Sequence, residues 1–112
     1  MMKQIAESDW KTFRDIHEVA LGRFCERILA EVMRVANDTS TPSHERYLLV
    51  YKLIQQRDTD IADAFNDMRR STAYYQLANM RGRDMVTDEE FARLTPETQD
   101  AVNLLLGIPV PK

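Results

Sequence analysis

The sequence predicts an all-α fold of about five helices. Glycine occurs only three times, and the four prolines fall near boundaries between apolar stretches. Apolar residues recur three or four positions apart, which is helical spacing, instead of alternating as in a half-buried strand. A chain of 112 residues has the size of one domain. We therefore predict a single helical domain over 1–112, with terminal tails at 1–7 and 108–112.

The first predicted helix begins at Ser8 or Asp9, either of which can cap it, and ends near Ala36, before a polar loop. It would be about 42 Å long, whereas a compact domain of this size has a radius of gyration of about 13 Å. Its apolar stripe is then longer than the domain that should cover it, which favours a homodimer. The predicted dimer interface consists of Trp10, Phe13, His17, Leu21, Phe24, Ile28 and Val32.

A second helix is predicted to start at Thr41-Pro42, with threonine as the cap and proline in the first turn. Apolar residues lie on most of its sides, so we expect it to be the central, buried helix against which the first one packs. The polar segment 55–60 leaves two possibilities open. A bend there would allow a compact helical bundle, and a continuous helix would give an elongated dimer.

The remaining helices are predicted from stop and cap signals. The apolar spacing over 60–81 fits one uninterrupted helix, which Gly82 would end. Thr87 and Glu90 form a capping-box pattern that opens a short helix, and Thr95, followed by proline, starts the last helix.

The segment 58–83 resembles a helix-turn-helix, which gives a first alternative function, a DNA-binding transcriptional regulator. Its candidate nucleic-acid contacts are Arg69, Arg70, Ser71, Tyr74, Arg81 and Arg83. The predicted turn is one residue too long and contains no glycine, and the chain carries a net charge of −3. The competing interpretation is an amphipathic helix whose arginines contact Asp63, Asp67 or the acidic C-terminal region.

His17 and the tyrosines give a second alternative, a small helical ligand-binding protein or enzyme with a pocket near His17. A histidine on an apolar face can serve as a base near neutral pH. The aromatic residues that could line such a pocket are Trp10, Tyr47, Tyr51, Tyr74 and Tyr75. At helical spacing, however, such residues are more typical of a core or an interface. We expect His17 to be a core or interface residue that is hydrogen-bonded to a facing helix.

Composition and motifs favour a protein without catalytic, cofactor-binding or metal-binding residues, and we expect no cofactor. Cys25 is the only cysteine, which excludes an intrachain disulfide and a cysteine zinc cluster. Asp60, Asp63 and Asp67 share one side of a helix but offer too few ligands for a metal ion. The sequence contains no phosphate-binding loop, catalytic triad signature or zinc-protease motif.

The leading hypothesis is therefore a non-enzymatic protein–protein interaction module that acts as a homodimer or through another protein partner. The net charge of −3 provides no general attraction to nucleic acid or to an anionic membrane. No apolar run approaches the length of a membrane span, and no N-terminal signal segment is evident. We expect a cytoplasmic protein.

Overall fold

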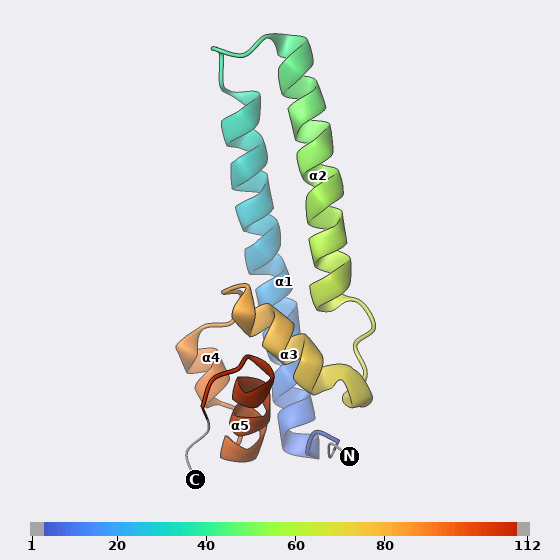
Figure 1. Cartoon of the computed structure of the whole chain (residues 1–112), viewed down its shortest axis with the longest axis vertical. Helices are drawn as coiled ribbons and strands as arrows, with labels where there is room; N and C mark the ends of the chain where they lie inside the picture. The colour runs from blue at the N-terminus through green and yellow to red at the C-terminus, as the bar shows by residue number, and fades with distance from the viewer. Residues whose placement is uncertain (1–3, 110–112) are drawn as a thin grey trace.

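The computed structural model describes residues 4–109, which form a helical hairpin and a smaller helical head. The hairpin consists of α1 (Glu7–Ala36) and α2 (Ser43–Phe65). The head contains the short 3-10 helix η1 (Arg70–Thr72) followed by α3 (Ala73–Gly82), α4 (Asp88–Ala92) and α5 (Pro96–Leu105). Figure 1 shows the head packed around the N-terminal half of α1, with the hairpin projecting beyond it. The all-α prediction with five α-helices and a long N-terminal helix is confirmed.

The central helix of the molecule is α1. Its 30 residues span about 45 Å, and one face of it is buried from Phe13 to Ile28. In contrast, α2 buries only Ala64 and Phe65, so the prediction that the second helix is the buried one is wrong. The head covers α1 from the side, whereas it meets only the C-terminal end of α2 (Figure 1).

The N-terminal segment is more closely packed than predicted. Ile5 is 3% exposed and belongs to the core, and Glu7 already lies in α1, so residues 4–7 do not form a free tail. At the other end, Ile108 and Pro109 are exposed and follow α5 without helical structure. The rest of the predicted C-terminal tail, 110–112, lies outside the described residues.

Residues 37–42 form the turn of the hairpin. The Arg46 guanidinium closes this turn by donating to the carbonyl oxygens of Ala36, at 2.6 Å, and Thr41, at 3.0 Å. Beyond the turn, α2 runs without a bend through 55–60, which selects the continuous-helix alternative. The molecule is accordingly elongated, 55 × 25 × 22 Å, and its radius of gyration of 17.0 Å exceeds the roughly 13 Å of a compact domain of this length.

The predicted single helix over 60–81 is interrupted. The chain leaves α2 after Phe65, and Asp67 adopts a left-handed conformation with a φ of 64° that an α-helix does not contain. His17 Nε2 donates to the Phe65 carbonyl oxygen at 2.8 Å, and the Thr72 hydroxyl donates to the Asp67 carbonyl oxygen at 2.8 Å. These two contacts satisfy carbonyl groups that a continuing helix would otherwise use. Met68, which the uninterrupted helix would place on the core face, is exposed.

The predicted start and stop signals of the head are confirmed. The last residue of α3 is Gly82. The Thr87 hydroxyl accepts from the Glu90 amide, and the Glu90 carboxylate accepts from the Thr87 amide, which is the reciprocal capping box. Both terminal nitrogens of the Arg23 guanidinium on α1 also donate to the Glu90 carboxylate oxygens, at 2.9 and 3.0 Å. The hydrogen bonds from Arg23 lower the pKa of the Glu90 carboxyl from its ordinary value.

Asp9 is the other polar link between α1 and the head. Its side chain is 1% exposed, and its carboxylate accepts from the Thr95 amide at 3.0 Å and from the Thr95 and Thr98 hydroxyls at 2.5 Å. The carboxylate therefore caps the N-terminus of α5, where the helix dipole favours negative charge. Burial by itself would raise the pKa of the Asp9 carboxyl. The hydrogen bonds from Thr95 and Thr98 together lower this pKa by more than burial raises it, so it lies below the ordinary value of 3.8.

Replacing Asp9 by asparagine is expected to destabilise the protein and to weaken its acid sensitivity. The buried carboxylate accepts three hydrogen bonds, and loss of this charged acceptor should cost about 1–3 kcal/mol of unfolding free energy at neutral pH. Because the folded-state pKa is lowered, the contribution of Asp9 is complete above about pH 4 and is lost as the pH falls through the folded value. Urea unfolding between pH 2 and pH 7 measures both effects.

The matched control is Asp15→Asn, which removes an exposed carboxylate that lies 3.4 Å from Arg93. This pair is largely solvated, so the variant should unfold almost like the wild type. Equal stability losses in the two variants would contradict the role assigned to Asp9.

Candidate interaction surface

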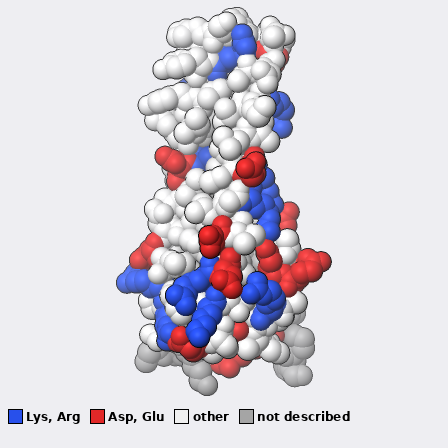
Figure 2. All heavy atoms as spheres, turned by 180° about the vertical axis from the view of Figure 1, so that it is seen from behind, with Lys and Arg blue, Asp and Glu red and all other residues white. Residues whose placement is uncertain are grey.

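The part of the hairpin beyond the head carries large apolar side chains that the chain itself leaves exposed. Leu29 is 55% exposed, Tyr47 66%, Tyr51 54% and Ile54 46%. Figure 2 shows this part of the molecule from behind as largely uncharged, whereas acidic and basic residues gather around the lower half. An apolar area of this kind is typical of an interaction surface.

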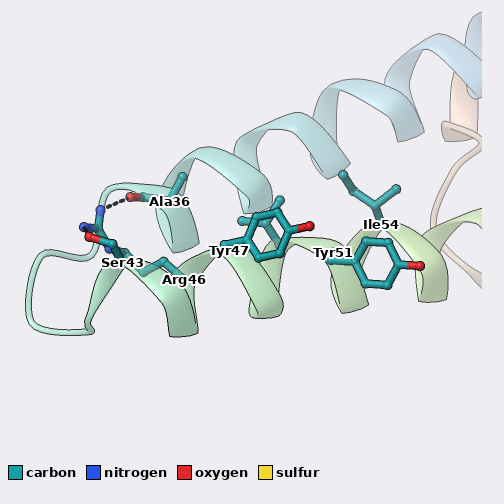
Figure 3. A pocket seen from close by; sticks show the side chains of 7 residues that line it. Ala36, Ser43, Arg46, Tyr47, Tyr51 and Ile54 are labelled. Atoms are coloured by element: carbon teal, nitrogen blue, oxygen red, sulfur yellow. Dashed lines mark hydrogen bonds between the residues drawn. The ribbon is translucent and has the colours of Figure 1, made fainter.

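A groove runs along the hairpin between α1 and α2, and it consists of two hollows that share Ile54. The hollow near the turn has a volume of about 430 Å³, and the one near the head has a volume of about 310 Å³. Figure 3 shows Tyr47, Tyr51 and Ile54 in line along α2 in the first hollow, with Arg46 turned toward the end of α1. We call this side of the hairpin the groove face.

Each helix contributes to the groove face a row of residues at heptad spacing. The row on α1 is Cys25, Leu29, Val32 and Ala36, and the row on α2 is Tyr47, Tyr51, Ile54 and Asp58. In both rows the steps are four, three and four residues, which is the pattern by which helices pack side by side in coiled coils and bundles. The groove face therefore has the spacing of a helical interface, and within these two rows only Asp58 interrupts the apolar or small character.

The head lies on the opposite side of the hairpin from the groove face. Arg23 and Arg27 of α1 bind the head through the carbonyl oxygens of Met85 and Asp84, both at 2.5 Å. Cys25 and Leu29 follow these arginines by two residues, which is about 200° around the helix. A partner can therefore approach the groove face without meeting the head.

Charged side chains line the groove near the turn and in the hollow near the head. Arg46 lines the hollow near the turn, and Arg57 and Asp58 line the hollow near the head. Arg57 is held by the carboxylates of Glu31 and Asp60, at 2.9 and 3.0 Å. Asp58 is exposed and makes no ion pair or hydrogen bond within residues 4–109. The groove is thus apolar along its length, with a cation at one end and a free carboxylate at the other.

The chain itself buries part of the interface predicted from the sequence. Phe13, Phe24 and Ile28 lie in the core, where they are 0%, 9% and 8% exposed. The predicted interface residues that are only half-buried are Trp10, His17, Leu21 and Val32. Of the whole predicted set, only Ile28 and Val32 line the groove. The predicted stripe belongs to the core because the head folds back onto α1. The exposed apolar side chains lie on the next row around the helix.

The contribution of α2 to this surface is not predicted from the sequence. The second helix is predicted to be buried, whereas the structure exposes its Tyr47, Tyr51 and Ile54. The heptad spacing of this row was the available signal, because it runs beside a second row at Val50, Leu53 and Arg57 that faces α1 and is half-buried. Two adjacent rows on one helix indicate two separate partners.

The four arginines among the candidate nucleic-acid contacts form ion pairs with acidic residues of the chain itself. Arg69 pairs with Asp67 at 2.7 Å, Arg70 with Glu7, Arg81 with Asp88 at 2.6 Å, and Arg83 with Asp60 at 3.0 Å. Arg83 also lies 3.9 Å from Asp63. Of the acids expected in the competing interpretation, Asp63, Asp67 and Asp88 of the C-terminal region do contact these arginines, whereas Glu7 and Asp60 are further partners and the segment is not one helix.

The other two residues of this set, Ser71 and Tyr74, do not form a DNA-contacting surface together with the arginines. Tyr74 is 6% exposed and packs in the core, and Ser71, although exposed, lies in η1 and not on α3. The face of α3 that a recognition helix would insert into DNA is therefore partly used for packing inside the protein.

His17 is a half-buried histidine that bonds to the facing helix α2, as expected. Besides its hydrogen bond to the Phe65 carbonyl, its ring contacts the edges of the Phe13 and Phe65 rings. Neither groove hollow is lined by His17, and Tyr47 and Tyr51 lie toward the far end of the hairpin. The structure does not bring His17 and these tyrosines together in one pocket.

The described part of the chain contains neither a cluster of metal ligands nor a membrane-spanning helix. Within residues 4–109, no three histidine, cysteine or acidic side chains gather as metal ligands would. Over the same residues, every helix is too short or too polar to cross a bilayer. Comparisons with protein-family models, with curated proteins and with solved structures found no match to this chain.

The groove residues are expected to contribute little to the stability of the single chain. Phe13→Ala removes a fully buried ring and should cost about 3–5 kcal/mol of unfolding free energy, whereas Ile54→Ala on the groove face should cost less than about 1 kcal/mol. Urea unfolding of dilute protein, followed by circular dichroism, measures the difference. Similar losses for the two variants would mean that Ile54 belongs to the core of the single chain.

Proposed function

We propose that the protein is a non-enzymatic protein–protein interaction module that acts as a homodimer through the groove face. The observation that supports this function is the pair of heptad-spaced rows exposed on one side of the hairpin, away from the head. A second hairpin laid on these rows completes a four-helix bundle, in which the exposed tyrosines and aliphatic side chains leave water.

The size of the surface sets the expected strength of the dimer. Each row spans 12 residues, or about 18 Å, and two helices side by side are about 20 Å wide. The resulting face of roughly 400 Å² per copy is below the roughly 800 Å² per partner of a standard stable interface. We therefore expect a reversible dimer with a dissociation constant in the micromolar range, so that assembly follows protein concentration.

The polar groups of the groove favour binding over catalysis. Arg46 already donates to carbonyl oxygens of the hairpin turn, and Arg57 to two carboxylates of the chain. Their main tasks are therefore to close the turn and to join the two helices. Small-molecule and active sites need several polar groups that converge on one point, whereas here the charged groups stand at the two ends of an apolar surface.

A charge in the middle of the groove face is expected to abolish dimerisation without unfolding the chain. Ile54→Glu would bury an unpaired carboxylate in the dimer, which should weaken association by at least about tenfold. The matched control is Leu48→Glu, because Leu48 is also exposed on α2 but lines neither groove hollow. Sedimentation equilibrium gives the dissociation constants, and circular dichroism checks that both variants fold.

Two outcomes would contradict the proposal. One is a wild-type protein that stays monomeric at about 100 µM, well above the expected micromolar dissociation constant. The other is equal weakening by Ile54→Glu and Leu48→Glu, which would place the contact elsewhere on α2.

Cys25 provides an independent measure of coverage of the groove. It is half-buried in the single chain and lines the hollow near the head. Its reaction with a thiol reagent should slow as protein concentration rises, because the dimer covers it. A labelling rate independent of concentration, over a range in which sedimentation shows dimers, would place the contact away from the groove face.

A further inference from the structure

We propose that the two copies pair with their hairpins reversed, so that Tyr47 of one copy meets Asp58 of the partner subunit. This inference rests on the proposed homodimer and specifies its orientation. In the reversed dimer α1 packs on α1 and α2 on α2, and the two hairpin turns lie at opposite ends.

Twofold symmetry allows two ways of laying one groove face on another. A twofold axis across the hairpin gives the reversed pairing. An axis along the hairpin places both turns at the same end and packs α1 of one copy on α2 of the other. The heads do not decide between them, because they lie behind both faces.

The spacing of the two rows fits the reversed pairing. The steps of four, three and four residues have the same order in both directions along the helix. Each row can therefore pack in register on the same row of the partner subunit. On α2 this places Tyr47 opposite Asp58, and Tyr51 opposite Ile54. On α1 it places Cys25 opposite Ala36, and Leu29 opposite Val32.

A single axis can serve both rows because their midpoints lie at similar heights. The end of α2 contacts α1 at two levels, where the Phe65 carbonyl accepts from His17 and the Phe65 ring stacks on Phe24. Measured from the middle of these two levels, the midpoint of the α1 row lies about 10 residues toward the turn, and that of the α2 row about 12 residues. The two distances differ by two to three residues, or about 4 Å along the axis.

The polar groups at the ends of the α2 row select the reversed pairing. Within residues 4–109, neither the Tyr47 hydroxyl nor the Asp58 carboxylate makes a hydrogen bond, although both groups line the groove. Reversal brings this donor to this acceptor twice in each dimer, and it brings Arg46 to the end that carries Asp58. The same-direction pairing instead places the two Asp58 carboxylates at one end and the two Arg46 guanidinium groups at the other, where like charges repel.

Disulfide trapping distinguishes the two orientations, with Cys25 as one of the two thiols. In the reversed dimer, Cys25 lies opposite Ala36 of the partner subunit, so Ala36→Cys should give a covalent dimer on mild oxidation. In the same-direction dimer, Cys25 lies level with Asp58 of the partner subunit, so Asp58→Cys should be the variant that cross-links. Ala30→Cys is the control, because Ala30 is exposed on α1 and does not line the groove.

Non-reducing gels then give distinct results for the orientation and for the homodimer. A covalent dimer from Ala36→Cys that exceeds those from Ala30→Cys and Asp58→Cys is the expected result. A covalent dimer mainly from Asp58→Cys overturns the reversed orientation and leaves the homodimer standing. Sedimentation of the unmodified protein is the separate test of the homodimer, and monomers at every concentration would overturn both proposals.

A double-mutant cycle tests the predicted contact itself. Tyr47→Phe and Asp58→Asn should each weaken the dimer, and the double variant should be no weaker than the more damaging single change, because both remove the same hydrogen bond. Fully additive effects would show that Tyr47 and Asp58 do not meet. Both groups are exposed in the single chain, so the variants should keep the wild-type circular dichroism spectrum.

Discussion

The length of α1 is the constraint from which the rest of the structure follows. This helix spans about 45 Å, and the head covers only its N-terminal part. Beyond Ile28, α2 is the only element within residues 4–109 that packs on it. Two helices touch along one line and cannot enclose each other, so the hairpin leaves apolar side chains in water. The head therefore divides α1 into a part whose apolar side chains are buried and a part that contributes exposed apolar side chains to the groove face.

Polar and apolar contacts together join the head to α1. The Asp9 carboxylate bonds to α5, and the Arg23 guanidinium binds Glu90. Beside these polar contacts lies an apolar core, in which Leu77, Met80 and Val102 of the head are fully buried. The two helices of the hairpin, in contrast, are tied by Arg46 at the turn and by Arg57 further along α2, and α2 buries only Ala64 and Phe65. The hairpin therefore keeps an apolar side that can accept a partner.

Features of the fold that depend on neighbouring residues could be predicted from the sequence. The end of α1, the capping box of Thr87 and Glu90, and the stop at Gly82 are local signals. The end of α2 could not be predicted, because Ile61, Ala64 and Phe65 continue at helical spacing into the next segment. What ends this helix is a contact from His17, which is 48 residues away in the chain. The local spacing of apolar residues does not reveal a contact between residues so far apart in the chain.

The length of the apolar stripe predicts that some apolar surface stays uncovered, but it does not show which part of the stripe the chain covers for itself. Phe13 and Phe24 are buried by the head and by the end of α2, respectively, and this depends on how distant segments fold back. The adjacent row that begins at Cys25 contains smaller side chains, and it is the row that lines the groove.

The separation of core and groove also bears on how the interface can vary. Because Tyr47, Tyr51 and Ile54 are largely exposed in the single chain, we expect their replacement to change association far more than folding. In the proposed homodimer, the palindromic spacing of the rows sets the geometry, and the unlike polar groups at the ends of the α2 row choose between the two symmetric arrangements. Orientation in such a dimer depends on a few polar side chains, while the apolar rows provide most of the attraction.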